Sequence, residues 1–205
     1  MSTGRDDAFE SALAALRTRL RDGNFPPGGR IPASALAASL KLSATPVREA
    51  LSRLAGEGLV EERRNQGFFV RTLSGVDVAD LYRLALAHML IVVGRDRERR
   101  PPTAPDTDPG ADPVRAVEGF FQAWVAEAGS RALGQMHQTI ATQLGPVRRV
   151  EPRVLDDLDL EADALLRSAG TGEAQELAQG LRRFHGRRIQ AAEKLAAALN
   201  LGRKI

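Results

Sequence analysis

The chain contains no cysteine and only three histidines among its 205 residues. The absence of cysteine excludes disulfides, thiolate zinc sites and cysteine nucleophiles. Few general bases are available, and no Ser/His/Asp grouping or catalytic carboxylate pair stands out. No apolar run approaches the length of a membrane span, and the N-terminus carries acids and lacks a signal-peptide core. We therefore expect a cytoplasmic protein that is not an enzyme.

The sequence also lacks an internal repeat, a glycine-rich phosphate loop and the strand–helix alternation of a nucleotide-binding α/β domain. Its composition is that of an ordinary globular protein, in a chain long enough for two small domains. The net charge of +3 is unevenly divided. Residues 1–75 hold 11 Lys and Arg against 8 Asp and Glu, whereas residues 76–205 balance. A positive N-terminal third suits a domain that faces a polyanion.

Three short helices are predicted in the first 56 residues. The first carries an apolar stripe at spacings of four, three and four: Phe9, Leu13, Leu16 and Leu20. The second covers about residues 34–40. The third opens at Thr45-Pro46, because Thr can cap free N–H groups and Pro at the first helical position loses no hydrogen bond. Its apolar face comprises Val47, Ala50, Leu51 and Leu54, and its other face comprises Thr45, Arg48 and Ser52.

Two extended segments, 59–62 and 68–71, follow the third helix. They are joined by Arg63-Arg64-Asn65-Gln66-Gly67, which suits a tight hairpin tip because Gly67 can take a positive φ angle. Three helices followed by a basic hairpin is the order of a winged helix-turn-helix. A further helix is predicted over residues 76–94. Residues 95–113 then contain five of the eleven prolines, which indicates a disordered loop or linker.

Beyond this loop the pattern is wholly helical. One stripe comprises Val114, Val117, Phe121, Trp124 and Ala128, and another comprises Leu155, Leu158, Ala162, Leu165 and Ala169. A long last helix begins with Leu177, Leu181 and Phe184 and ends near Asn200. We predict that Trp124 packs in the core. The expected fold is mostly α with a small β wing: a winged helix-turn-helix over residues 8–74 and an all-helical bundle over residues 76–205.

Residues 22–70 resemble the winged-helix domain of GntR-family transcription regulators. Four motifs occur in the family's order and spacing: Pro27-Gly28-Gly29-Arg30, Thr45-Pro46-Val47-Arg48-Glu49-Ala50-Leu51, Glu57-Gly58-Leu59-Val60 and Asn65-Gln66-Gly67. The resemblance implies that a homodimer binds double-stranded operator DNA with two-fold symmetry. It implies these DNA contacts: Arg30, Ser43, Thr45, Arg48, Ser52, Arg64, Asn65 and Gly67. The alternative is a winged helix that contacts proteins instead of DNA.

The chemistry of these residues agrees with the resemblance. Arg48 lies in the first turn of the third helix, where its guanidinium can read a guanine edge or hold a phosphate. Thr45 is placed to meet backbone phosphate at the helix N-terminus. Ala44 departs from the family, which commonly has an arginine there, and Ala33 replaces a frequent glutamate. Loss of the arginine should weaken or redirect DNA recognition and leave the helices intact.

The C-terminal half is similar to the FCD ligand-binding domain of one GntR subfamily. The similar residues are 78–84, Phe121, 128–133 and Phe184-His185. The resemblance implies a helical cavity for a small carboxylate, often around a metal held by one aspartate and three histidines.

The metal-ligand positions are poorly filled in this sequence. Glu118 stands in place of the aspartate, Gln122 replaces one histidine, another falls near Ala162 or Asp163, and only His185 matches. Since an amide oxygen binds transition metals weakly, we expect no metal and no other cofactor. The candidate effector-binding residues are Glu118, Gln122, Asp163 and His185.

Two functions are open at this point. In the first, a dimeric repressor is released by a small carboxylate, which arginines around His185 would bind directly. In the second, the regulator has no effector and its helical domain only dimerises. His185 itself has a plain alternative as a polar residue of an arginine-rich helix.

Overall fold

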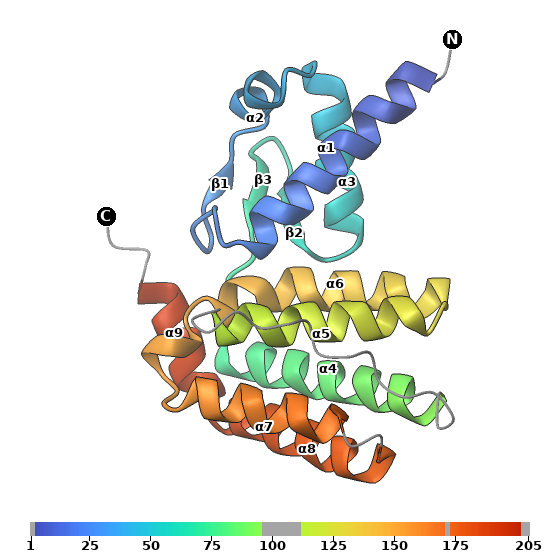
Figure 1. Cartoon of the computed structure of the whole chain (residues 1–205). Coiled ribbons are helices and arrows are strands. Elements are labelled where there is room, and N and C mark those ends of the chain that lie inside the picture. The colour runs from blue at the N-terminus through green and yellow to red at the C-terminus, as the bar shows by residue number, and fades with distance from the viewer. Residues whose placement is uncertain (1–2, 96–111, 171–172, 202–205) are drawn as a thin grey trace.

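The computed structural model describes residues 3–95, 112–170 and 173–201, and the fold is mostly helical with a small β wing, as predicted (Figure 1). The N-terminal part contains α1 (Thr3–Arg21), β1 (Arg30–Ile31), α2 (Ala33–Leu40), α3 (Ala44–Gly56), β2 (Val60–Arg63) and β3 (Gly67–Val70). The helical part contains α4 (Gly75–Arg95), α5 (Pro113–Glu127), α6 (Arg131–Arg148), the 3₁₀ turn η1 (Glu151–Arg153), α7 (Leu158–Gly170), α8 (Ala174–Gln190) and α9 (Ala192–Leu201). Residues 96–111 of the predicted loop lie outside the described residues, so its disorder stays a prediction.

The N-terminal part has a hydrophobic core of its own, built from α1, α2, α3 and the sheet. The apolar face predicted for α3 is fully buried in it: Val47, Ala50, Leu51 and Leu54. On α1 the most deeply buried stripe is Ala12, Leu16 and Leu20, while Phe9 and Leu13 are half-buried at its edge. Since α1 and α3 pack on each other, these two stripes hold the region together.

The third helix begins two residues earlier than predicted. Ser43 is its N-cap residue, in an extended conformation, and Ala44 is the first helical residue. Pro46 is therefore the third helical residue and not the first. The position tolerates proline because the first turn of a helix has no intrahelical acceptor for its N–H groups. The helix ends as predicted, with Gly58 at a φ of 72°.

The wing is a three-stranded antiparallel sheet in the order β1-β3-β2. The sequence predicts only the β2–β3 hairpin. The missed strand, β1, has two residues, too few to show any alternation, and its Ile31 pairs with Phe68 of β3. At the hairpin tip, Arg63 pairs with Gly67, which takes the predicted positive φ of 95°. Asn65 also has a positive φ, of 59°.

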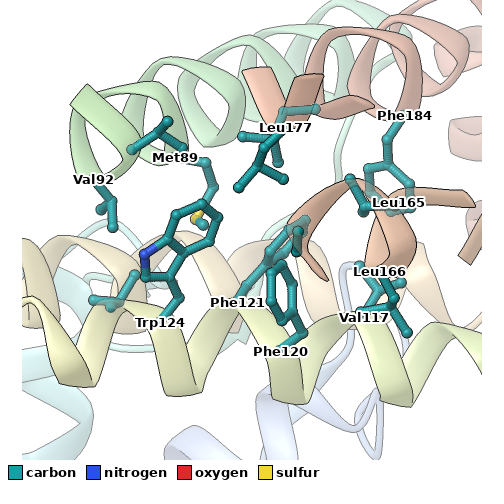
Figure 2. Packing of buried hydrophobic residues seen from close by; sticks show 14 of the residues in the cluster. Met89, Val92, Val117, Phe120, Phe121, Trp124, Leu165, Leu166, Leu177 and Phe184 are labelled. Carbon is teal, nitrogen blue, oxygen red and sulfur yellow. The ribbon is translucent and has the colours of Figure 1, made fainter. Parts of the chain in front are cut away.

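The helical part packs α4 between α5 and α6 on one side and α7 and α8 on the other (Figure 1). Its main core lies between α5 and the helices α4, α7 and α8, and Figure 2 shows Trp124 facing Met89 and Val92 of α4. Trp124 is thus a core residue, as predicted. Two details of the prediction are wrong. The last helix is broken at Ala191 into α8 and α9, and Leu155 lies before α7 instead of within it.

The N-terminal part rests on the helical part through α1 and α6 (Figure 1). The contact is at backbone level, since a Cβ on Gly145 would overlap the carbonyl oxygen of Arg21 and come within 2.7 Å of its Cα. Gly145 therefore lets the end of α1 approach α6. Within the described ranges, no helix is both long and apolar enough to cross a membrane.

Candidate nucleic-acid interface and ligand cavity

One side of α3 is exposed to solvent and carries polar side chains. Thr45, Arg48 and Ser52 all lie on it, as their spacing predicts. Ser43 precedes them and is exposed too, and its side chain makes no capping hydrogen bond. This side of α3 therefore presents hydroxyls and a guanidinium, and the first turn adds its free backbone N–H groups to the same surface. Such a surface suits phosphate oxygens and base edges.

The wing contributes further basic side chains. Arg64 and Asn65 are exposed at its tip, and Arg30 is exposed on the edge strand β1. A Cβ on Gly67 would lie 3.6 Å from Nε of Arg30, so the Arg30 side chain lies against the hairpin beside Gly67. Arg30 and the tip thus belong to one part of the wing.

The arginines among the candidate DNA contacts differ from a nearby arginine of the wing, because they have no ionic partner among the described residues. Within the described part of the chain, no side-chain hydrogen bond or ion pair engages Arg30, Arg48 or Arg64. By contrast, Arg63 pairs with Glu61 at 2.8 Å and stacks on the ring of Phe69. The unpaired arginines can meet an external anion without breaking an internal contact.

Glu57, at the C-cap of α3, links this helix to α1. It accepts a hydrogen bond of 2.6 Å from Nη2 of Arg17 and one of 2.9 Å from Nε of Arg53. Both Arg17 and Glu57 are largely buried, with 12% and 19% of their side chains exposed. The end of α3 is therefore tied to a side chain of α1 that also faces the helical part.

A cavity of about 370 Å³ lies where α1 meets α5 and α6. Its polar and charged lining comes from all three helices: Arg17, Thr18, Arg21, Glu118, Gln122, His137, Gln138, Thr142 and Arg148. The rest of the wall is small or apolar: Ala14, Val125, Ala126, Gly134 and Ala141. The volume is within the range of small-molecule sites.

Two of the four predicted effector-binding residues, Glu118 and Gln122, line this cavity. Glu118 is held by arginines of α6: its Oε1 lies 3.4 Å from Nη1 of Arg148, and its Oε2 contacts Arg149. The glutamate is thus committed to these cations. Glu118 thereby orients Arg148 at the cavity wall. Its two oxygens are engaged by arginines and are not available to bind a metal.

The other two predicted effector-binding residues lie elsewhere. Asp163 is exposed on α7 and pairs with Arg167 at 3.8 Å, so it does not share a site with Glu118. His185 is fully buried in the helical core, stacked on Phe121, with Nδ1 2.9 Å from the carbonyl oxygen of Leu181. Burial lowers the pKa of this imidazole to about 3. Such a histidine is neutral, and the structure supports its plain role as a core residue.

Arg188, the buried arginine near His185, is bound within the protein. Arg188 is buried and bound to Glu151 through two hydrogen bonds, of 3.0 and 2.8 Å, and to Glu161 at 2.9 Å. Glu151 also accepts a hydrogen bond of 2.5 Å from Tyr82, and burial raises the pKa of that phenol. This network occupies the guanidinium of Arg188, so Arg188 is not free to bind an anion beside His185.

A metal site of the kind that the FCD resemblance implies does not fit these residues. In the described ranges no group of three or more His, Cys, Asp or Glu side chains is placed to hold an ion. His185 and Glu118 belong to separate environments, one in the aromatic core and the other paired with Arg148 and Arg149.

The cavity residues on α1 were missed from sequence, although a signal was present. Ala14, Arg17, Thr18 and Arg21 recur at the spacing of one helix face. This second face of α1 is adjacent to its apolar stripe and reads as an ordinary solvated surface. Only the fold reveals that α6 lies against it.

Comparison with known proteins concerns mainly the N-terminal part. Residues 9–70 match the profile of bacterial regulatory proteins of the gntR family. Over 61 residues the chain is 51% identical to the Nta operon transcriptional regulator of Aminobacter aminovorans, a match that covers 30% of this chain and 29% of that protein. The matched segments of the curated relatives span 29% to 48% of their own lengths.

Two solved structures resemble almost the whole chain. Escherichia coli McbR/YncC has a TM-score of 0.75 at 19% identity, over 91% of this chain and 97% of that one. A putative transcriptional regulator GntR from Rhodococcus sp. RHA1 has a TM-score of 0.69 at 20% identity, over 92% and 97%. At such identities the likeness shows the shared fold. The specific similarity of the C-terminal half to an FCD domain stays a prediction.

Proposed function

On the premise that residues 9–70 form a helix-turn-helix domain of the gntR family, we propose that this protein is a transcription regulator that binds operator DNA. The observation that carries the proposal is the exposed side of α3, where Arg48, the fifth helical residue, has no ionic partner among the described residues. A guanidinium in that place can form two hydrogen bonds with a guanine edge. Thr45, Ser43 and Ser52 supply hydroxyls for phosphate contacts beside it.

The wing has a supporting role in this proposal. Arg64 and Asn65 at the tip, together with Arg30 and Gly67, contact the DNA backbone or the minor groove next to the bases that α3 reads. Residues 8–74 are then the DNA-binding domain, and residues 76–205 carry dimerisation and effector response. The separate hydrophobic cores of the two parts favour this division.

We also propose that the protein acts as a homodimer, because a two-fold operator presents two half-sites. An apolar stripe on α4 supports a helical interface. Leu84, Ala87 and Ile91 lie on one exposed face of that helix, and the two larger side chains are 46% and 58% exposed. Exposed apolar side chains in such a row favour burial against a second copy.

The direction of regulation is a further part of the proposal. The dimer represses transcription, and binding of a small carboxylate releases it from the operator. Ligand binding changes the spacing of the two DNA-binding domains and thereby their fit to the half-sites.

The test of DNA binding begins with selection of bound sequences from random DNA. With the selected operator, Arg48→Ala should cost about 1–3 kcal/mol of binding free energy at fixed salt, because Arg48 contacts a base. Its thermal unfolding should be unchanged, since the side chain is exposed. The matched control is Arg182→Ala, which removes an exposed arginine of α8. It should bind the operator with the affinity of the parent protein. Equal affinities for all three proteins would refute the assignment of α3.

The dimer is tested by light scattering at micromolar concentration. The parent protein should have the mass of two chains, and Leu84→Glu with Ile91→Glu should have the mass of one, because a charge cannot be buried at an apolar interface without a large cost. A parent protein that is monomeric with and without DNA would disprove this part of the proposal.

A further inference from the structure

We propose that the cavity between α1, α5 and α6 binds a small organic carboxylate and that Arg17 transmits its occupancy to α3. The inference deepens the proposed function, because it assigns the effector to a place between the two parts of the molecule. It differs from the sequence-based expectation, in which the ligand lies near His185.

The charge of the cavity favours an anion. Three arginines line it, Arg17, Arg21 and Arg148, against one glutamate, Glu118. Arg21 has no ion pair with any residue that the structure describes, and Glu118 is shared between two arginines of α6. The wall therefore has cationic hydrogen-bond donors in excess of its carboxylate acceptors. A carboxylate would accept charge-assisted hydrogen bonds from them.

One donor at this wall is unused. Nη1 of Arg17 is buried and has no hydrogen-bond partner within the described chain, while Nη2 is bound to Glu57. A buried guanidinium N–H without an acceptor is costly, so a ligand oxygen that reached it would gain more than a surface contact does.

The remaining wall defines the body of the ligand. Val125, Ala126 and Ala141 provide apolar surface, and Gln122 provides an amide beside it. A volume of about 370 Å³ accommodates a small aliphatic or aromatic acid. The neighbouring cavity beside Arg188 measures about 10 Å³, which is room for a single water at most.

The position of Arg17 couples the cavity to α3. The same guanidinium lines the cavity and holds Glu57 at the C-cap of α3. A carboxylate bound at Nη1 shares the positive charge of Arg17 with Glu57, which is bound at Nη2, and so weakens the tie between α1 and the end of α3. Binding of DNA and binding of the carboxylate then oppose each other, and each lowers the affinity for the other by the same factor.

The test uses isothermal titration calorimetry of the full chain without DNA. The probes are acetate, benzoate and succinate, each paired with its neutral amide. At least one acid should bind with a Kd of about 1 mM or tighter, and its amide should bind at least tenfold more weakly. Arg17→Gln should weaken binding of that acid about tenfold or more, while Arg182→Gln should not change it. Ala141→Leu, which fills the cavity and keeps every charge, should weaken it too.

Thermal unfolding of each variant shows whether it is folded before it is titrated. Absence of binding by all three acids, or binding that survives both Arg17→Gln and Ala141→Leu in folded proteins, would overturn the site. Failure of the proposed function gives a different result, since the acid would then bind normally and no DNA would be selected.

Coupling is measured on the selected operator with the acid that binds best. The acid should weaken DNA binding of the parent protein about fivefold or more. Glu57→Gln removes the competing carboxylate, so it should bind the acid more tightly and lose most of the effect of the acid on DNA. An acid effect that is unchanged in Glu57→Gln would exclude the route through Arg17.

Discussion

The two parts of the molecule use arginine in opposite ways. In the N-terminal part, Arg30, Arg48 and Arg64 are exposed, and none has an ion pair with a described residue. In the helical part, Arg188 is buried and bound to two glutamates, and Arg148 is buried beside Glu118. Burial of an unpaired charge would be costly, so the helical part supplies a carboxylate for each of these cations.

The comparison explains why net charge says so little about the helical part. Residues 76–205 balance their positive and negative residues, and the two buried arginines Arg148 and Arg188 are paired with glutamates inside the fold. The N-terminal excess is small, but it stands on the surface. Whether an arginine is available to an external anion therefore depends on its exposure and its partners and not on the charge of the region.

The largest effect is expected when a carboxylate is removed from the core of the helical part. Glu151→Gln should lower the free energy of unfolding by about 3–5 kcal/mol, because it leaves Arg188 buried with only Glu161 as an ionic partner. Tyr82 also loses a charged acceptor. Urea unfolding followed by circular dichroism measures the loss.

The matched control is Asp163→Asn, which breaks an exposed pair with Arg167. Its effect should stay within about 0.5 kcal/mol, since solvent screens such pairs. Similar losses for the two variants would mean that the buried pair is worth no more than a surface one.

A second test acts where the two parts meet. Gly145→Ala introduces a Cβ that overlaps the backbone of Arg21, so α1 must move away from α6. We expect a loss of about 1–3 kcal/mol in stability, the usual cost of overpacking. The change should also alter the cavity between these helices.

Gly119→Ala is the control for helix propensity. A Cβ there meets no atom within 4 Å, so the protein should be equally stable or gain about 0.5–1 kcal/mol. If both substitutions stabilised the protein, the close contact between α1 and α6 would be disproved.

The sequence predicts the N-terminal part well for a physical reason. Its helices are amphipathic with clear stops, and its functional side chains are the polar face that remains once the apolar face is buried, as for Arg48 against Leu51. The errors are local. A proline in the first turn does not say which position of that turn it occupies, and a strand of two residues, β1, has no periodicity to read.

The site in the helical part could not be read in the same way. His185 and Asp163 were selected by their place along the chain, and the fold puts one in the core and the other on the surface. Arg17 and Arg148 lie 131 positions apart and line one cavity only because Gly145 lets α1 approach α6. Contacts of this kind depend on packing between regions, which no local pattern records.

The smallest expected effect is a dependence of stability on pH. It comes from His185, which is buried and neutral, in contrast to the exposed and charged arginines of the N-terminal part. Burial lowers the pKa of His185 to about 3, below the ordinary value of 6.5. Between these values the unfolded chain binds a proton that the folded chain refuses. The free energy of unfolding should therefore be highest above pH 6.5 and decrease as the pH falls, by at most about 1.4 kcal/mol per pH unit from this group.

His185→Leu removes the titrating group and keeps an apolar side chain of similar size in the aromatic core. Urea unfolding at several pH values between 7 and 5 should give a shallower decrease for the variant than for the parent. Part of the slope should persist, because burial also lowers the pKa of His137, to about 4. The same slope in both proteins would show that His185 accepts its proton in the folded state, which a group buried against Phe121 and the carbonyl of Leu181 can do only if the core around it opens.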